Sequence, residues 1–307
     1  MTAEARTAQT GSTTRSNGLR RVLGGVSGGV FEAVPQNRVA LLRVVIYLFT
    51  ICDTVWIVND VYSLAAGSQE LYHPMLMRRM FHLPTPNHTY ALALHVVIIA
   101  ACLLCASGRL PRALGVLVGL VAAAAFTDWV SIGMSYSKVD HDHFALIVAL
   151  WVLPTVGVAR FQDWSRSEAA GWALFCIQVG CVAIYFLSAL AKFRFGGWNW
   201  ATGSTFAWAM TRRGTGLGKM LLEPPWILLV SQFMVITLEL LTPLILVFRG
   251  RNRYVFVVLL LGFHLSTFLA LTIHFLPLVI CLLAFLPLER HSTTKAQRTS
   301  GGRVITR

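Results

Sequence analysis

A lysine at the end of a long apolar segment is the residue in this sequence whose type and position best suit chemistry. Tyr185, Ser188 and Lys192 are spaced so that all three share one face of a helix. Burial disfavours the charged form of an amine, so a lysine at this depth could accept a proton from a bound substrate. The alternative is an anchoring lysine whose charged head reaches the lipid headgroups.

Two other polar residues also stand inside apolar segments. A carboxylate such as Glu239 is costly inside a bilayer unless it is protonated or paired, for instance with Arg43 or a histidine. His264, with Ser266 and Thr267 close by, is either a histidine satisfied by a neighbouring helix or part of a pocket. Each of these residues is therefore a candidate for function and for a purely structural pair.

A segment rich in tryptophan, glycine and cations follows the lysine. Trp198 and Trp200 alternate with Gly196, Gly197 and Gly203 just beyond the apolar run. One interpretation is that these tryptophans only form an aromatic belt at the membrane surface. Their alternation with glycines and basic residues instead predicts a re-entrant or interfacial segment that caps a cavity.

A run of alternating acids and histidines, Asp140 to His143, resembles a metal-binding motif. Such a run is more often a solvated turn between two helices, so we predict no metal site here. The six cysteines all fall in apolar segments and read as small buried hydrophobic residues rather than as a disulfide framework.

The composition of the chain predicts which kind of element positions these residues. Hydrophobic residues make up 56% of the chain and charged residues 13%, against about 25% charged in soluble domains. A helix needs roughly 20 apolar residues to cross the hydrocarbon core. We therefore predict an all-α, polytopic membrane bundle of about eight helices. The predicted spans are Val39–Val58, Tyr90–Ala106, Ala113–Met134, His143–Val158, Ala169–Lys192, Pro225–Phe248, Tyr254–Thr272 and Ile273–Leu288.

The last two spans share one apolar run, and we place the break between them near Thr272–His274. The domain prediction has three parts: a disordered or interfacial cytoplasmic segment at 1–37, a transmembrane domain at 38–288 and a basic disordered cytoplasmic tail at 289–307.

The basic residues predict the orientation in the cell membrane. The net charge of +13 comes mainly from arginines and lysines at the ends of apolar segments, which is typical of cytoplasmic anchors rather than of a nucleic-acid partner. Their distribution predicts a multi-pass protein with both termini in the cytoplasm. The cations that violate this rule cluster between Lys192 and Lys219, which suggests that this external segment belongs to a site.

The order of these motifs resembles a known family. Tyr185-Phe186, Lys192, a tryptophan and Gly203 are followed by Glu239 between two leucines and then by Phe263-His264. This order resembles the transmembrane domain of vitamin K-dependent gamma-glutamyl carboxylase and the wider group of HTTM (horizontally transferred transmembrane) proteins. In the carboxylase, the lysine that matches Lys192 is the base that starts vitamin K hydroquinone oxygenation.

The resemblance implies a function and a site. It implies a membrane enzyme that acts on a quinol of the menaquinone or vitamin K type, or on another lipid-soluble substrate. Lys192 would be the base, and the substrate-binding residues would be Tyr185, Ser188, Trp198, Glu239 and His264. Membrane lipid is the expected partner, and a secreted or membrane protein is the candidate protein substrate. The alternative is a non-catalytic membrane partner or assembly factor, with a transporter as a third hypothesis.

Overall fold

The computed structural model describes residues 32–138 and 140–289. Five helical segments in this part of the chain are long and apolar enough to cross a membrane. These are α2 (Gln36–Cys52) with its π-helical extension η1 (Asp53–Ile57), α5 (His88–Ala106), α6 (Arg112–Ser135), α8 (Glu168–Gly196) and α14 (Arg251–Leu271).

Three shorter apolar segments occupy the other predicted spans. They are η3 (His141–His143), α7 (Phe144–Val152) and η4 (Leu153–Val156) taken together, α12 (Pro225–Leu241), and α15 (Leu276–Cys281) with η5 (Leu282–Phe285). The structure therefore confirms an almost entirely helical chain with several apolar membrane helices. A total of eight spans remains a prediction.

The remaining elements are short. A two-stranded antiparallel sheet pairs β1 (Val34–Pro35) with β2 (Arg166–Ser167). The other short helices are α3 (Val61–Ala65), η2 (Gln69–Leu71), α4 (Leu76–Met80), α9 (Asn199–Thr202), α10 (Thr205–Arg213), α11 (Gly216–Met220) and α13 (Leu244–Val247). The predicted segment 1–37 lies mostly, and the tail 289–307 almost wholly, outside the described residues.

Local sequence signals set several helix ends. The Ser167 side chain accepts a hydrogen bond from the Ala170 amide and caps the start of α8, as serine commonly does. α8 then runs without proline for 29 residues. The predicted break after α14 is present, because α14 ends at Leu271 and Thr272 adopts a left-handed conformation with φ of 56°. Pro277 stands in the first turn of α15, where proline does not interrupt helical hydrogen bonding.

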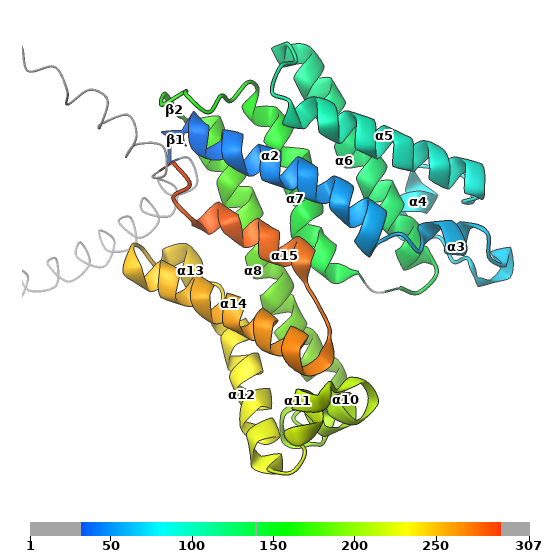
Figure 1. The fold of residues 1–307 in the computed structure, drawn as a ribbon, viewed down its shortest axis with the longest axis vertical. Coiled ribbons are helices and arrows are strands. Elements are labelled where there is room, and N and C mark those ends of the chain that lie inside the picture. The colour runs from blue at the N-terminus through cyan, green and yellow to red at the C-terminus, as the bar shows by residue number, and fades with distance from the viewer. Residues whose placement is uncertain (1–31, 139, 290–307) are drawn as a thin grey trace, which may run out of the picture.

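The helices form two groups (Figure 1). α2, α5, α6, α7 and α8 pack together in the larger group, whose core contains fully buried Phe126 and Trp129 of α6. In the smaller group, α12 and α14 lie beside the second half of α8, and α9 to α11 close its lower end in the view. α8 belongs to both groups and connects them.

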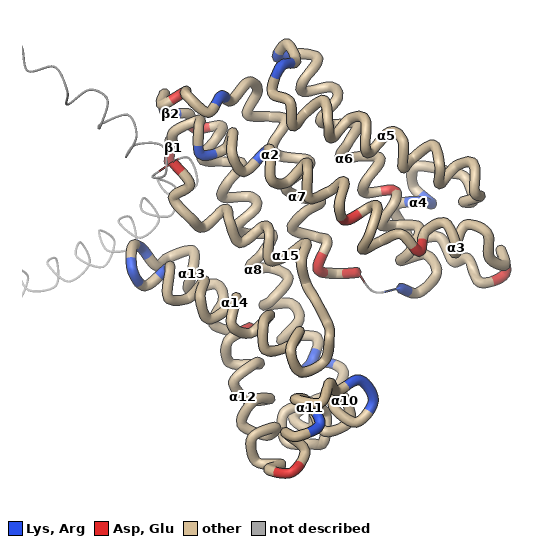
Figure 2. Tube along the Cα trace, in the orientation of Figure 1, with Lys and Arg blue, Asp and Glu red and all other residues tan. Residues whose placement is uncertain are grey.

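One end of the bundle is held by contacts between distant parts of the chain. The β1–β2 pair joins the start of α2 to the start of α8, and Arg38 lies 3.6 Å from Glu289. Basic residues gather at this end, for example in the turn between α13 and α14 (Figure 2). A second basic group marks α10 and α11 at the opposite end (Figure 2).

Candidate functional site

Lys192 and Glu239 form an ion pair between α8 and α12. The lysine Nζ lies 2.7 Å from Oε1 and 2.6 Å from Oε2 of the glutamate. Ser188, one turn earlier on α8, accepts a third hydrogen bond from Nζ at 2.7 Å. The glutamate side chain is 5% exposed and the lysine side chain 18%. Glu239 is thus neither unpaired nor bound to Arg43, whose guanidinium instead donates to the carbonyls of Leu153 and Gly157.

A second polar pair lies between α8 and α14. The Tyr185 hydroxyl is 2.6 Å from Nε2 of His264, and both side chains are buried. The ring of His264 also packs against Phe263 and Phe275, with centroids 5.0 and 5.3 Å away. Both polar pairs therefore use residues of the same face of α8, as the spacing of Tyr185, Ser188 and Lys192 predicts.

Both pairs line one cavity of about 520 Å³. Most of its wall is aliphatic or aromatic, contributed by α8, α10, α11, α12, α14 and α15. Its polar lining residues are His141, Tyr185, Ser188, Lys192, Ser231, Glu239, His264, Ser266 and Thr267. Cavities of roughly 300–1,000 Å³ that are mostly apolar with a few placed polar groups are typical of small-molecule sites.

The segment that follows α8 closes one end of this cavity. Phe206 and Met210 of α10 and Leu217 of α11 form part of its wall. This placement agrees with the predicted cavity cap. We call residues 199–220, which contain α9, α10 and α11, the cap.

A buried glutamine fastens the cap to α12. Gln232 donates from Nε2 to the carbonyl oxygens of Ala201 and Gly203, at 2.7 and 3.0 Å, and its Oε1 accepts from the Phe206 amide at 2.7 Å. The cap also contacts α14 so closely that a Cβ on Gly218 would stand 2.2 Å from the Ala270 carbonyl oxygen. Only glycine permits this approach without displacing the backbone.

Trp198 is the one predicted site residue that the structure does not bring to the cavity. Its side chain is 69% exposed and packs edge-on against Phe193. Trp200 lies at the cavity instead, with its ring centroid 5.2 Å from Nζ of Lys192, within the range of a cation–π contact. Both tryptophans follow the turn at Gly197, and because they stand two residues apart at the start of α9 they point to different sides of that helix.

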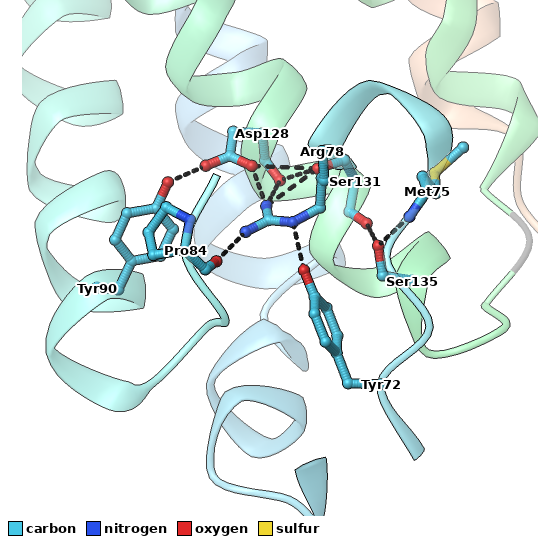
Figure 3. A network of polar contacts seen from close by, with 8 residues as sticks. All are labelled: Tyr72, Met75, Arg78, Pro84, Tyr90, Asp128, Ser131 and Ser135. Atoms are coloured by element: carbon cyan, nitrogen blue, oxygen red, sulfur yellow. Dashed lines mark hydrogen bonds and ion pairs between the residues drawn. The ribbon is translucent and has the colours of Figure 1, made fainter. Parts of the chain in front are cut away.

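The acidic residues near the end of α6 divide into two separate groups. Asp140, Asp142 and His143 lie together at the start of α7. Asp128 instead accepts hydrogen bonds from Arg78 and Tyr90 (Figure 3). Arg78 is 1% exposed and also donates to Tyr72, Ser131 and the Pro84 carbonyl (Figure 3).

This arginine network joins α4 to α5 and α6 and lies away from the cavity. A pair of adjacent arginines before a proline-rich turn gives no signal that one of them is buried.

The comparison with known proteins finds one matching domain family. Residues 142–290 match the model of the HTTM domain. This range contains every helix that carries the two polar pairs. The chain therefore carries an HTTM domain, and the family resemblance inferred from the sequence is confirmed. With its apolar helices, it is a membrane protein. Neither a curated protein nor a solved structure matches the chain.

Proposed function

We propose that this protein is a membrane enzyme that removes a proton from the hydroxyl group of a lipid-soluble substrate, with Lys192 as the base. The observation that carries the proposal is the Lys192–Glu239 pair at the wall of a largely apolar cavity. A merely anchoring lysine would direct its head toward lipid headgroups. Lys192 instead directs its amine toward a buried carboxylate and a substrate-sized space.

The cavity favours a substrate with an apolar ring system and a polar edge. Its aliphatic and aromatic wall suits a ring and an isoprenoid-like tail, whereas Lys192, Ser188 and Glu239 suit a hydroxyl group. A quinol of the menaquinone or vitamin K type has this combination. The HTTM domain, through its likeness to the vitamin K-dependent carboxylase, supports the same substrate class.

The pair can accept one proton without leaving an isolated buried charge. Lys192 and Glu239 together hold one ionisable proton, which lies on the amine or on the carboxylate. When it lies on Glu239, Lys192 is a neutral amine that can take the substrate hydroxyl proton. The products are an ammonium, a carboxylic acid and a substrate oxyanion, so the proton lost by the substrate is the proton gained by the pair. The new ammonium lies beside the oxyanion and stabilises it.

Tyr185 and His264 would orient the substrate from a second point on the wall of the same cavity. Their hydrogen bond fixes the direction of the tyrosine hydroxyl and of the imidazole ring. Phe263 and Phe275 hold that ring in place. We assign these residues to substrate binding and polarisation and not to the first proton transfer.

The test compares lysine with arginine on purified full-length protein in lipid nanodiscs. Reduced menaquinone and vitamin K hydroquinone are supplied with dioxygen, and oxidation is followed by fluorescence. Lys192→Arg keeps the positive charge, but arginine does not give up its proton in proteins. Loss of a positioned base lowers rates by roughly 10²- to 10⁴-fold, so we expect a loss in this range. The exposed Lys219→Arg is the matched control and should keep wild-type turnover.

Two results would refute the base assignment. One is wild-type turnover in folded Lys192→Arg. The other is the absence of any quinol binding or oxidation by the wild-type protein, which would favour the non-catalytic membrane partner. Ion flux through protein-containing liposomes would favour the transporter.

A further inference from the structure

A second cluster of ionisable groups lies outside the machinery proposed above. It is formed where η1, at the end of α2, meets η3, at the start of α7. Asp53 belongs to η1, and Asp142 and His143 belong to η3, which Asp140 immediately precedes. One ligand atom from each of Asp140, Asp142 and His143 lies within 4.8 Å of the other two. Figure 2 shows this acidic stretch between α6 and α7.

The two nitrogens of His143 have different surroundings. Nε2 lies 3.0 Å from Oδ2 of Asp53, whose side chain is fully buried. When Nε2 carries the only ring proton and donates it to this carboxylate, Nδ1 keeps a lone pair. Nδ1 is buried and has no hydrogen-bond partner among the described residues. The His143 side chain is only 3% exposed, so water does not readily serve as that partner.

Nδ1 itself faces a carboxylate. Oδ1 of Asp142 is 3.3 Å away, and one oxygen of Asp140, Oδ2, is buried with the Lys138 ammonium 3.3 Å away as its charged neighbour. In a neutral ring, the electron pairs of Nδ1 and of the carboxylate face each other in a buried place, and they repel unless a proton or a metal ion lies between them. Ligands bound at about 2.0–2.1 Å in tetrahedral geometry are separated by about 3.3 Å, so the Nδ1–Oδ1 distance fits two neighbouring ligands of one metal ion.

We propose that Asp140, Asp142 and His143 bind a divalent transition-metal ion such as Zn²⁺ or Mn²⁺. One imidazole and two carboxylates suit these ions better than they suit soft, thiolate-preferring metals. Asp53 is the positioning residue, because a carboxylate on the far nitrogen fixes the tautomer and ring orientation of a metal-bound histidine. The alternation of acids and histidines predicts a solvated turn here, but His143 and Asp53 are buried, and their burial changes that interpretation.

The local charge supports a divalent cation. Asp53, Asp140 and Asp142 contribute three carboxylates. The nearest lysine, Lys138, lies 3.3 Å from Oδ2 of Asp140 and 2.9 Å from Oδ1 of Asp60. Its single positive charge is thus shared with a fourth carboxylate. The described residues leave an excess of negative charge that a bound divalent ion would balance.

The site adjoins the substrate cavity but does not depend on its function. His141 stands between Asp140 and Asp142 in the chain, lines the cavity and packs near Phe275, with centroids 6.3 Å apart. A bound ion would hold this turn in place. Metal binding can therefore be measured whether or not a quinol is the substrate.

The test is metal binding by the full-length, tag-free protein in nanodiscs. The protein is stripped with a chelator and titrated with Zn²⁺ and, separately, Mn²⁺, and the bound metal is measured by calorimetry and elemental analysis. We expect one ion per chain and a higher melting temperature with metal. Asp142→Asn, which keeps the side-chain shape, should weaken binding at least tenfold. Asp53→Asn should weaken it by about 10–100-fold, as loss of an orienting carboxylate does elsewhere.

Asp60→Asn is the matched control, because it removes a neighbouring carboxylate that contacts Lys138 but is not a proposed ligand. It should bind metal as the wild type does. The proposal is overturned if the stripped wild type binds no more Zn²⁺ or Mn²⁺ than Asp142→Asn, or if Asp60→Asn loses binding to the same extent. Either result would leave His143 as an imidazolium held between Asp53 and Asp142. If Asp142→Asn does not fold, His143→Gln replaces it with the same expected loss.

Discussion

Gln232 and Glu239 lie two turns apart on one face of α12, and together they connect the cap of the cavity to the ion pair inside it. Gln232 is 1% exposed and Glu239 4%. The first holds the cap through three hydrogen bonds, and the second holds Lys192. A single helix face thus sets both the closure of the cavity and the position of the proposed base.

Replacing Gln232 tests the connection to the cap. Gln232→Leu leaves the Ala201 and Gly203 carbonyls and the Phe206 amide without their side-chain partner. An unsatisfied buried polar group costs about 1–3 kcal/mol, so we expect the cap to open more often. Hydrogen exchange of residues 199–213 should be faster, with little change in α5 and α6. The exposed Gln69→Leu serves as control, and unchanged exchange in the cap would show that Gln232 does not hold it.

Replacing Glu239 tests its partnership with Lys192. Glu239→Gln keeps the shape and can still accept a hydrogen bond from the lysine, whereas Glu239→Lys places two ammonium groups together. A lysine at such depth costs of order 3 kcal/mol on insertion scales. We expect near-normal yield and thermal stability for the glutamine variant and a large loss for the lysine variant. The same two changes at exposed Glu223 should be tolerated alike, and equal behaviour at Glu239 would contradict its burial.

The buried Arg78–Asp128 network should be a major source of stability outside the cavity. Arg78→Met leaves the Asp128 carboxylate without its cation, and breaking a buried pair in this way costs about 3–5 kcal/mol. The adjacent Arg79 is exposed, so Arg79→Met is a closely matched control. Thermal unfolding in detergent should show a clear drop for the first variant only. Equal melting temperatures would mean that the network contributes little.

The orientation in the membrane can be tested by cysteine labelling from one side. The predicted topology places the cap outside and the segment between α7 and α8 in the cytoplasm. Ser204→Cys in the cap and Gln162→Cys in that segment both replace exposed residues. An impermeant maleimide added to intact cells should label the first variant and reach the second only after permeabilisation. The reverse pattern would invert the proposed topology.

Helix positions could be predicted closely from the sequence. Each apolar run had to be long enough to shield its backbone from lipid, so hydropathy alone placed the segments. The break after Leu271 was also predictable, because one run was too long for a single helix. The spacing of Tyr185, Ser188 and Lys192 likewise predicted a shared helix face, since that follows from helical periodicity.

The partners of these residues could not be predicted in the same way. Lys192 and Glu239 are 47 residues apart, and Tyr185 and His264 are 79 apart. Such pairs depend on how α8, α12 and α14 are rotated and crossed, which periodicity within one helix does not specify. Arg43 was a plausible partner for Glu239 by charge, but it lies at carbonyl groups on another helix.

By itself, therefore, the sequence determined a helical membrane protein, its resemblance to HTTM proteins, and one helix face rich in polar residues. Only the tertiary structure decided that Glu239 is the partner of Lys192, that Trp200 rather than Trp198 reaches the cavity, and that His143 is buried between carboxylates. The physical reason is that the composition of each segment decides by itself whether that segment forms a helix in lipid. A site, in contrast, depends on the relative rotation of several helices and on the turns between them.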